Sequence, residues 1–194
     1  NDSGYETAIE FKKNGVDSII LDTRKDPKSE IIDEAKKLDI QIKFSYVVVA
    51  AKGYKKVKSA EVAKISDDKN ELGTLETINC DCICVSGFWT PTIHLASQSG
   101  NKTTFNKDID AFVPGLSKQN ETTLGAANGT FTLEETLKKS FESGYELSKK
   151  ITNNNNKTSS PTVMEKKSTT HDKFWCVPLP KGKTYKRFLD FQND

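Results

Sequence analysis

The first forty residues alternate between helical and strand periodicity, and this alternation limits the possible fold more than any other feature. Residues 3–14 place their apolar side chains on one helical face, and Gly15 follows them at a typical helix end. Residues 16–21 form a short apolar run that ends at Asp22, and Asp26–Pro27 then opens a second helix. Helix, strand ending in Asp, and helix predict the middle of a dinucleotide-binding βαβ unit, where the acidic residue accepts the ribose hydroxyls.

The glycine-rich loop that normally precedes such a unit is not found in the sequence. Where a G-x-G-x-x-G pattern is expected, residues 1–5 contain only Gly4. Two explanations remain open: the glycines precede Asn1, or the domain has lost its nucleotide site, and we favour the second. For the same reason we interpret Asp22 and Arg24 as strand-end residues in a loop rather than as ligand contacts.

From residue 40 onwards the pattern changes to strands. Three extended runs, 40–51, 57–66 and 71–78, are separated by short polar turns. In the middle run, lysine and glutamate lie among apolar residues, which is typical of an antiparallel meander with one face in water. The sequence therefore predicts an α/β fold in which a Rossmann-like half carries an antiparallel meander.

The meander leads into Cys80–Pro91, with the sequence Cys-Asp-Cys-Ile-Cys-Val-Ser-Gly-Phe-Trp-Thr-Pro. The apolar run between Asp81 and Gly87 predicts a buried strand that ends in a tight turn. Its three alternating cysteines share one face, because side chains alternate along a strand. Same-face neighbours lie about 7 Å apart, which suits neither a disulfide nor a zinc site, so we interpret the thiols as inert buried hydrophobes.

A second turn leads into a helix after a short strand and turn at residues 105–115. The stretch Leu124–Phe131 is rich in glycine and alanine, Thr132 is positioned to cap the helix, and Glu135 completes a capping box. Apolar residues recur every four positions and predict one buried face, formed by Leu133, Leu137, Phe141 and Tyr145. Such a turn can hold a phosphate at the helix N-terminus, but it can equally be a close-packed structural turn.

Several functions are not expected from this sequence. The net charge is only +2, and 27 of the 29 basic residues are lysine, so we expect no nucleic-acid partner. No apolar run approaches the roughly 20 residues of a membrane helix, and no leader is recognised, so we expect a cytoplasmic protein without a membrane partner. The two histidines lack metal-ligand spacing, and no nucleophile elbow or Walker loop occurs. We therefore predict no catalytic residue and no metal site.

Two sets of residues resemble known flavoproteins. Cys80–Asp81, the apolar run, Gly87 and Pro91 resemble the return strand of disulfide-reductase-like flavoproteins with two dinucleotide-binding domains. A wider set is similar to the alpha subunit of heterotetrameric sarcosine oxidase: Val85–Leu95, Ser97–Lys102, Ala111–Gly115, Gly125–Gly129 and Phe188–Asp194.

The resemblance implies that the chain is an internal fragment of such a subunit. Residues 1–80 would form an inserted, degenerate second dinucleotide-binding domain, and residues 81–149 would return to complete the first one. Residues 150–173 are predicted to be a flexible linker from their composition alone, because they are polar and contain few apolar residues. Residues 174–194 would begin a further domain.

The resemblance also implies an activity and its cofactors. The family converts sarcosine, tetrahydrofolate and O₂ into glycine, methylenetetrahydrofolate and H₂O₂, as part of one-carbon metabolism. NAD is expected on the alpha subunit, FAD and FMN elsewhere in the complex, and tetrahydrofolate at a domain outside this sequence. The expected partners are the beta, gamma and delta subunits, and the fragment alone is expected to be inactive. Two alternatives remain: a related NAD- or FAD-dependent amine or opine oxidoreductase subunit, and a non-enzymatic interaction module.

The turn before the last predicted helix is the segment that the resemblance assigns to nucleotide contact. The residues expected to line it are Gly125, Ala126, Ala127, Thr130, Phe131 and Thr132. Ala126 stands where many flavoproteins carry the acidic residue of a Gly-Asp pair, which favours a non-redox NAD over an ordinary FAD.

Overall fold

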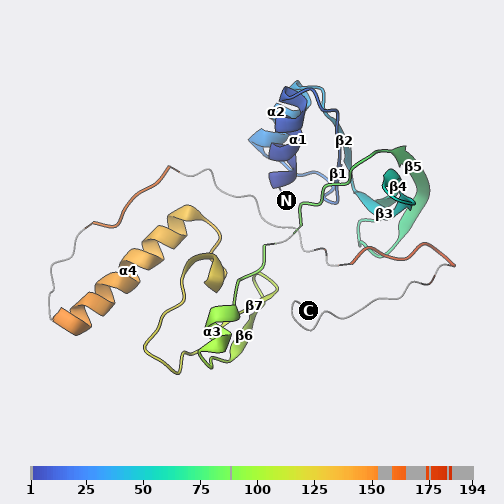
Figure 1. The fold of residues 1–194 in the computed structure, drawn as a ribbon. Coiled ribbons are helices and arrows are strands. Elements are labelled where there is room, and N and C mark those ends of the chain that lie inside the picture. Colours follow the sequence, from blue (N-terminus) through green and yellow to red (C-terminus); the bar gives the residue numbers. More distant parts are fainter. Residues whose placement is uncertain are drawn as a thin grey trace. The chain divides into compact units, whose positions relative to one another are not determined.

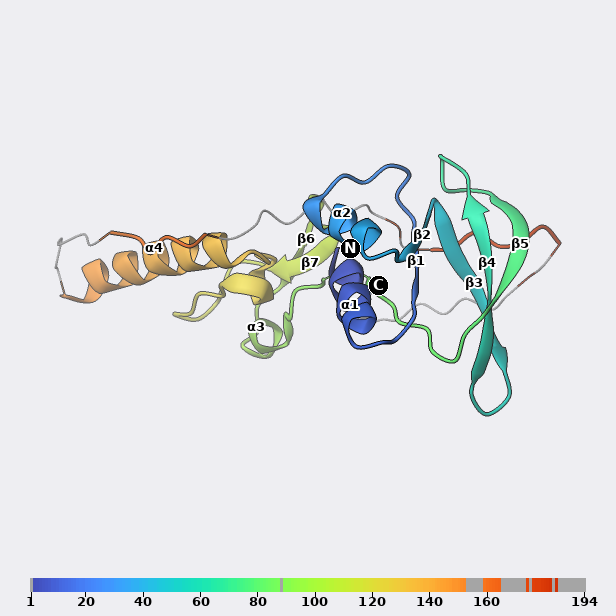
Figure 2. The same ribbon diagram turned by 90° about the horizontal axis from the view of Figure 1, so that it is seen from above.

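The structure is a computed structural model that describes residues 2–87, 89–152, 159–164, 174, 176–182 and 184. The chain divides into two compact units (Figures 1 and 2). The first contains Asn1–Ser86 and the described residues beyond position 171, and the second is Gly87–Thr170.

The first unit begins with two helices and a parallel pair of strands. Helix α1 (Ser3–Lys13) is followed by β1 (Ile19–Asp22), helix α2 (Glu30–Lys37) and β2 (Gln41–Phe44). β1 and β2 pair in parallel, with α2 as their connection, so β1–α2–β2 is a βαβ unit. Figure 1 shows the two helices side by side next to this pair. The predicted α/β class is therefore confirmed.

The core of this unit is made by the apolar faces of both helices. Its buried side chains are Tyr5, Ala8, Ile9, Ile32, Ala35 and Ile40, with Ile20, Ile31, Leu38, Ile42 and Phe44 packed against them. The helix predicted over residues 3–14 is confirmed, and Gly15 follows it with a φ of +77°, the left-handed conformation that commonly terminates helices.

Two element starts in this unit differ from the sequence prediction. β1 begins at Ile19 rather than at residue 16, because the chain first leaves α1 through a backbone bond from the Val16 N–H to the Phe11 carbonyl. α2 begins at Glu30 rather than at Asp26–Pro27, because Ser29 is extended and the first helical hydrogen bonds run from the N–H groups of Ile32 and Asp33 to the Ser29 carbonyl.

The predicted meander is confirmed as a three-stranded antiparallel sheet. It consists of β3 (Tyr46–Gly53), β4 (Val57–Ile65) and β5 (Leu72–Asn79), with β4 in the centre. The run predicted over residues 40–51 is divided between β2 and β3, because Ser45 has a φ of +56° and turns the chain. The Ser45 N–H donates to the Arg24 carbonyl, and its own carbonyl accepts from the Ile65 N–H, so the turn joins both sheets.

The buried strand predicted within Cys80–Pro91 is not formed. Residues 82–87 belong to no regular element, and Cys82, Cys84 and Val85 are exposed, Val85 by 87%. A strand needs a neighbour to pair its N–H and C=O groups, and no strand in the described part of the chain pairs with this segment. The predictions of a buried strand and of buried thiols are therefore wrong for this structure.

The second unit contains a short helix, a hairpin and a long helix. These are α3 (His94–Gln98), β6 (Thr103–Asn106), β7 (Ala111–Pro114), the 3₁₀ turn η1 (Gly125–Asn128) and α4 (Leu133–Thr152). The hairpin strand predicted from residue 105 starts at Thr103 and ends at Asn106, because Asp110, with a φ of +46°, forms part of the hairpin turn.

The buried face predicted for α4 is not found. None of its side chains is buried: Leu133 is 52% exposed, and Leu137, Phe141 and Tyr145 are only half-buried. Among the described elements, the helix contacts mainly η1. None of the described helices is both long and apolar enough to cross a membrane. Residues 153–158 and 165–173 of the predicted linker, and most of residues 174–194, lie outside the described residues.

Candidate functional site

The six residues expected at the nucleotide contact lie together in and after η1, at the start of α4. The turn is closed by its own backbone: the Gly129 N–H donates to the Ala126 carbonyl at 3.1 Å, and the Thr130 N–H donates to the Gly125 carbonyl at 3.0 Å. Gly125 and Gly129 both have positive φ, +67° and +74°. Glycine adopts this conformation without strain, so the sequence Gly-Ala-Ala-Asn-Gly favours this turn locally.

Both glycines are also required by close packing. A Cβ at Gly129 would lie 2.6 Å from Ile109 Cδ1, and a Cβ at Gly125 would lie 3.2 Å from Thr136 Cγ2. The turn is therefore a close-packed connection between the hairpin and α4. A structural role alone accounts for its glycines.

Thr130 connects the turn to α4 through both of its polar groups. It is only 4% exposed; its carbonyl accepts from Thr136 Oγ1 at 3.3 Å, and its Oγ1 accepts from Lys139 Nζ at 3.0 Å. Thr132 Oγ1 accepts from the Glu135 N–H at 3.4 Å, which is the N-cap half of the predicted capping box.

Lys139 is the residue at this site that the sequence prediction missed. Its ammonium group donates one hydrogen bond to Thr130. The lysine also adds a positive charge beside the N-terminal end of α4, where the helix dipole favours anions. Thr132, Thr136 and Lys139 are spaced by four and three residues, which places them on one helical face. That spacing was the signal that could have identified the lysine.

The remaining predicted residues present small or aromatic surfaces. Ala126 is exposed and Ala127 is half-buried, so neither side chain obstructs the turn. Phe131 contacts Trp89, with ring centroids 6.2 Å apart and ring planes tilted by 60°. The turn thus combines a helix N-terminus, one lysine and an aromatic pair, a combination able to bind a phosphate group next to a planar ring.

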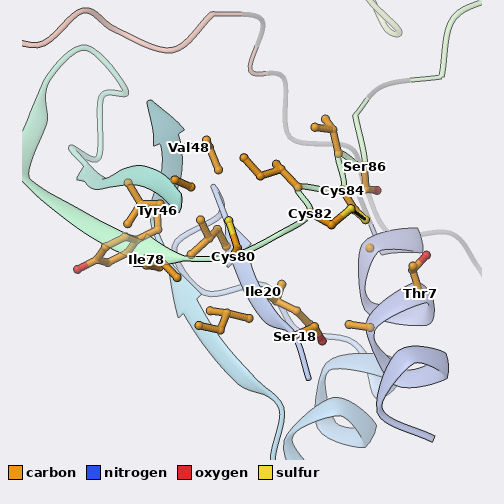
Figure 3. Close-up of a pocket in the computed structure, with 18 of the residues that line it drawn as sticks. Thr7, Ser18, Ile20, Tyr46, Val48, Ile78, Cys80, Cys82, Cys84 and Ser86 are labelled. Atoms are coloured by element: carbon orange, nitrogen blue, oxygen red, sulfur yellow. Dashed lines mark hydrogen bonds between the residues drawn. The ribbon is translucent and has the colours of Figure 1, made fainter. Parts of the chain in front are cut away.

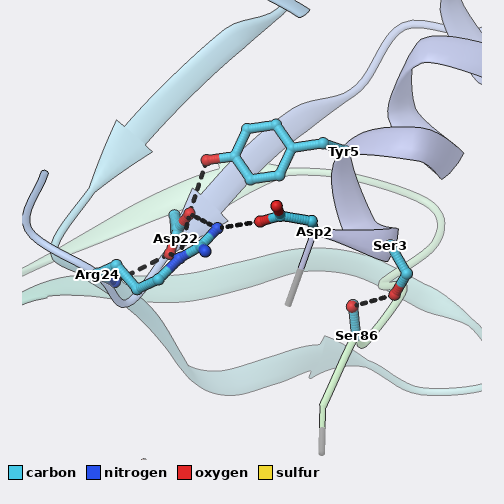
Figure 4. A network of polar contacts seen from close by, with 6 residues as sticks. All are labelled: Asp2, Ser3, Tyr5, Asp22, Arg24 and Ser86. Carbon is cyan, nitrogen blue, oxygen red and sulfur yellow. Dashed lines mark hydrogen bonds and ion pairs between the residues drawn. The ribbon is translucent and has the colours of Figure 1, made fainter. Parts of the chain in front are cut away.

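The acidic strand end of the first unit is a separate, closed network (Figure 4). The Tyr5 hydroxyl donates to Asp22 Oδ2 at 2.7 Å, while Arg24 donates to Asp22 through its backbone N–H, Nε and Nη2 at 2.9, 3.0 and 2.8 Å. Arg24 Nη2 also pairs with Asp2 Oδ1 at 2.9 Å. Asp22 is 6% exposed, and its carboxylate is occupied by donors of the protein itself.

The pKa shifts follow from this enclosure. Burial by itself would raise the pKa of Asp22, but the hydrogen bonds from Arg24 and Tyr5 outweigh burial and hold that pKa below its ordinary value. Burial and the Asp22 carboxylate raise the pKa of Tyr5 far above its usual range. Burial would lower the pKa of Arg24, but its hydrogen bond to Asp22 raises it. At neutral pH Asp22 and Arg24 are therefore charged and the Tyr5 hydroxyl is neutral. The network joins the start of α1 to the end of β1.

The first unit also contains a cleft of about 1240 Å³ (Figure 3). It is lined by α1, β1, β3, β4 and the segment that includes Cys80, Cys82 and Cys84. The Cys82 and Cys84 sulfurs lie 3.8 Å apart, and the hydrogen bond to Cys82 raises the pKa of Cys84. The described cysteines are free thiols, and no cluster of three or more metal-ligating side chains occurs among the described residues.

Comparisons with known proteins agree with the sequence resemblance. No family model matches the chain. The sarcosine oxidase alpha subunit of Rhizobium meliloti (strain 1021) is 29% identical over an alignment of 201 positions, which covers 100% of this chain and 18% of that protein. The corresponding subunit of Corynebacterium sp. (strain P-1) is 28% identical over 139 residues, 71% of this chain and 14% of that protein. The predicted resemblance to the sarcosine oxidase alpha subunit is therefore confirmed.

These matches cover only a small part of each relative. The chain spans less than a fifth of the length of the curated proteins that it matches. Among solved structures, the crystal structure of T. acidophilum thioredoxin reductase matches with a TM-score of 0.46 and 17% identity, covering 66% of this chain and 44% of that one.

Proposed function

We propose that this chain is a non-catalytic part of a cytoplasmic oxidoreductase of the sarcosine oxidase alpha type, in which it binds NAD and contacts other subunits. The observation that carries the proposal is the 29% identity to the Rhizobium meliloti subunit along the whole chain. The complete enzyme would oxidise sarcosine with O₂ and transfer the one-carbon unit to tetrahydrofolate. FAD, FMN and the beta, gamma and delta subunits would belong to that assembly.

The NAD site that we propose is the turn Gly125–Thr132. Three features support it: the N-terminus of the 20-residue helix α4, the Lys139 ammonium at Thr130, and the small side chains of Ala126 and Ala127. Helix N–H groups and a lysine favour the pyrophosphate of a dinucleotide, and alanines allow a close approach of the backbone. Gly125–Thr132 itself contains no acidic side chain, and Glu134 and Glu135 follow in the first turn of α4.

The lack of acid–base chemistry at this turn supports a non-catalytic role. The titratable side chain that hydrogen-bonds to the turn is Lys139, and a dinucleotide phosphate would engage its ammonium group. Ala126 offers no carboxylate to hold a flavin ribityl chain, which supports NAD as the ligand rather than FAD. In the purified chain alone, we expect no sarcosine-dependent release of H₂O₂, and measurable peroxide would contradict the non-catalytic role.

The site is tested by Ala127→Asp in the full assembly, with NAD released by denaturation and measured per flavin. The new carboxylate would stand at the helix N-terminus, where it competes with the phosphate, so we expect NAD content to fall by about tenfold or more. Gly125→Asp should have the same effect, although its positive φ and the contact with Thr136 also strain the fold.

The matched control is Gly144→Asp, in the middle of α4, where a Cβ would meet no atom within 4 Å. This variant adds the same charge within α4, away from the turn, so NAD content should remain at the level of the unmodified protein. Unchanged NAD in the Ala127→Asp variant would remove the ligand role of the turn.

A further inference from the structure

Two thiols come together in the segment that follows β5. The Cys82 and Cys84 sulfurs lie 3.8 Å apart, although same-face neighbours along a strand are separated by about 7 Å. The reason is that residues 82–87 belong to no regular element, so their side chains do not alternate along a pleat. The irregular backbone thus removes the spacing that argued against a bond between these two sulfurs.

The segment is held on both sides of this pair. On one side, the Cys80 N–H donates to the Lys58 carbonyl at 3.1 Å. On the other side, the Ser86 and Ser3 hydroxyl oxygens lie 2.7 Å apart at the start of α1. Between these points, no strand in the described part of the chain pairs with the backbone. The two sulfurs can therefore move closer together without breaking the hydrogen bonds of a sheet.

Both thiols of the pair are accessible to small solutes. Cys82 and Cys84 are free and exposed, although Phe174 and Val177 line the same cleft. Cys80 is only half-buried, but Figure 3 shows its sulfur apart from the other two. The contact thus involves two of the three alternating cysteines, and a small oxidant in solution can reach both of them.

The contact between the sulfurs gives the two cysteines different roles. The hydrogen bond to Cys82 raises the pKa of Cys84, so Cys84 retains its proton and donates it toward the Cys82 sulfur. Only a deprotonated cysteine is a good nucleophile, so Cys82 is the sulfur that reacts first with an oxidant. An accessible cysteine with a second thiol beside it is the arrangement found at redox-sensitive sites.

A pair of thiols can hold a soft metal ion or form a disulfide, and the surroundings favour the disulfide. Thiolate metal sites use further ligands, typically four in all. No group of three or more metal-ligating side chains occurs among the residues that the structure describes. A disulfide needs only these two sulfurs, which must approach from 3.8 Å to about 2.05 Å. Side-chain rotation on an irregular segment allows that approach.

We propose that Cys82 and Cys84 form a redox modification site, at which hydrogen peroxide converts the two thiols into one disulfide. The Cys82 thiolate attacks a peroxide oxygen, the O–O bond breaks, and Cys82 becomes a sulfenic acid while the released hydroxide takes up a proton as water. The Cys84 sulfur then attacks the Cys82 sulfur. The S–S bond forms, the S–O bond breaks, and the leaving hydroxide takes the Cys84 proton as water. The two thiols lose two electrons together, and one peroxide is reduced to two molecules of water.

The second thiol keeps the oxidation reversible. A sulfenic acid without a partner thiol is oxidised further to sulfinic acid, which thiols do not reduce, whereas a disulfide is reduced again by thiol–disulfide exchange. Hydrogen peroxide is also the product expected of the oxidase activity proposed above. The inference needs only peroxide from any source, so it is independent of that activity and of the proposed NAD site.

The first test locates the oxidised sulfurs by mass spectrometry of the 194-residue chain. The chain is treated with hydrogen peroxide, its free thiols are alkylated, and a protease that cleaves before aspartate separates Cys80 from the pair at Asp81. We expect the peptide 81–107 to lose two hydrogen atoms, to remain unalkylated and to recover both thiols with dithiothreitol. Two alkylated cysteines in this peptide, a sulfinic acid in it, or a bond from it to Cys80 or Cys176 would overturn the inference.

The second test removes the thiol that completes the disulfide. In the Cys84→Ser variant, peroxide should convert Cys82 to a sulfinic acid that dithiothreitol does not reverse, with a yield at least about tenfold above that in the unmodified chain. The matched control is Cys176→Ser, which removes an exposed thiol outside the pair, so the disulfide should form at the unmodified rate. Equal sulfinic acid yields in Cys84→Ser and the unmodified chain, or loss of the disulfide in Cys176→Ser, would overturn the inference.

Discussion

The two units of this chain differ in what holds their elements together. In the first, an 8-residue helix, α2, buries Ile32 and Ala35 completely against α1 and the parallel strands. In the second, a 20-residue helix, α4, buries no side chain. Instead, the buried residues among the described part of the second unit are Pro91 and a set of small or polar residues, namely Ala96, Asn101, Ala111, Gly125 and Thr130.

Both helices have apolar residues at helical spacing, so periodicity alone does not explain the difference. α2 is buried because a second apolar face, that of α1, and the strand residues Ile42 and Phe44 lie opposite it. Among the described elements, α4 contacts mainly the short turn η1. A regular apolar stripe therefore becomes a core only where the tertiary structure supplies its partner.

The largest expected effect of a single substitution is at the buried ion network of the first unit. Asp22→Asn leaves Arg24 with less compensation for its burial, so we expect the free energy of unfolding of this unit to fall by about 3–5 kcal/mol. This free energy of unfolding is measured by urea denaturation. Asp17→Asn, which removes an exposed ion pair with Lys12, is the matched control and should change it by less than about 0.5 kcal/mol. Equal effects of the two substitutions would show that the network does not stabilise the unit.

A pair of core substitutions compares the two helices directly. Ile32→Ala removes a fully buried side chain and should cost about 2–5 kcal/mol in the first unit. Leu137→Ala removes a half-buried side chain from α4 and should cost less than about 1 kcal/mol in the second. An equal loss of stability in the Leu137→Ala and Ile32→Ala variants would contradict this contrast, because it would show that α4 is packed as closely as α2.

A smaller effect is expected from pH. Because the pKa of Asp22 is lower in the folded unit than its ordinary value, its stabilisation is present above about pH 4 and is lost as the pH falls through the folded pKa. Thermal unfolding between pH 5 and pH 2 should therefore show a loss of stability in the first unit that is reduced in the Asp22→Asn variant. An identical pH profile in that variant would assign acid sensitivity to other carboxylates.

The sequence predicted those elements whose formation depends on neighbouring residues. α1 with Gly15 after it, the strands of the meander and the start of α4 at Thr132 all follow from local periodicity, capping residues and turn residues. The turn at Gly125–Thr132 was identifiable for the same reason, since its six residues are nearly contiguous. Lys139 escaped prediction because its contact with Thr130 crosses nine positions.

The failures concern burial, which a segment cannot decide for itself. Segment 82–87 has the composition of a buried strand, but strand formation requires a paired neighbour, and none is present among the described strands. The apolar stripe of α4 did not form a core, because among the described elements this helix contacts mainly the short turn η1 and buries none of its side chains.

What the sequence determined by itself is thus the order and type of most elements, the left-handed turns at Gly15, Gly125 and Gly129, and the resemblance to sarcosine oxidase alpha subunits. What only the tertiary structure decided is which apolar faces are buried, that Asp22 is enclosed by Tyr5 and Arg24, and that the Cys82 and Cys84 sulfurs lie 3.8 Å apart. The physical reason is that backbone conformation is chosen over a few neighbouring residues, whereas burial and hydrogen-bond pairing depend on groups that are distant in sequence.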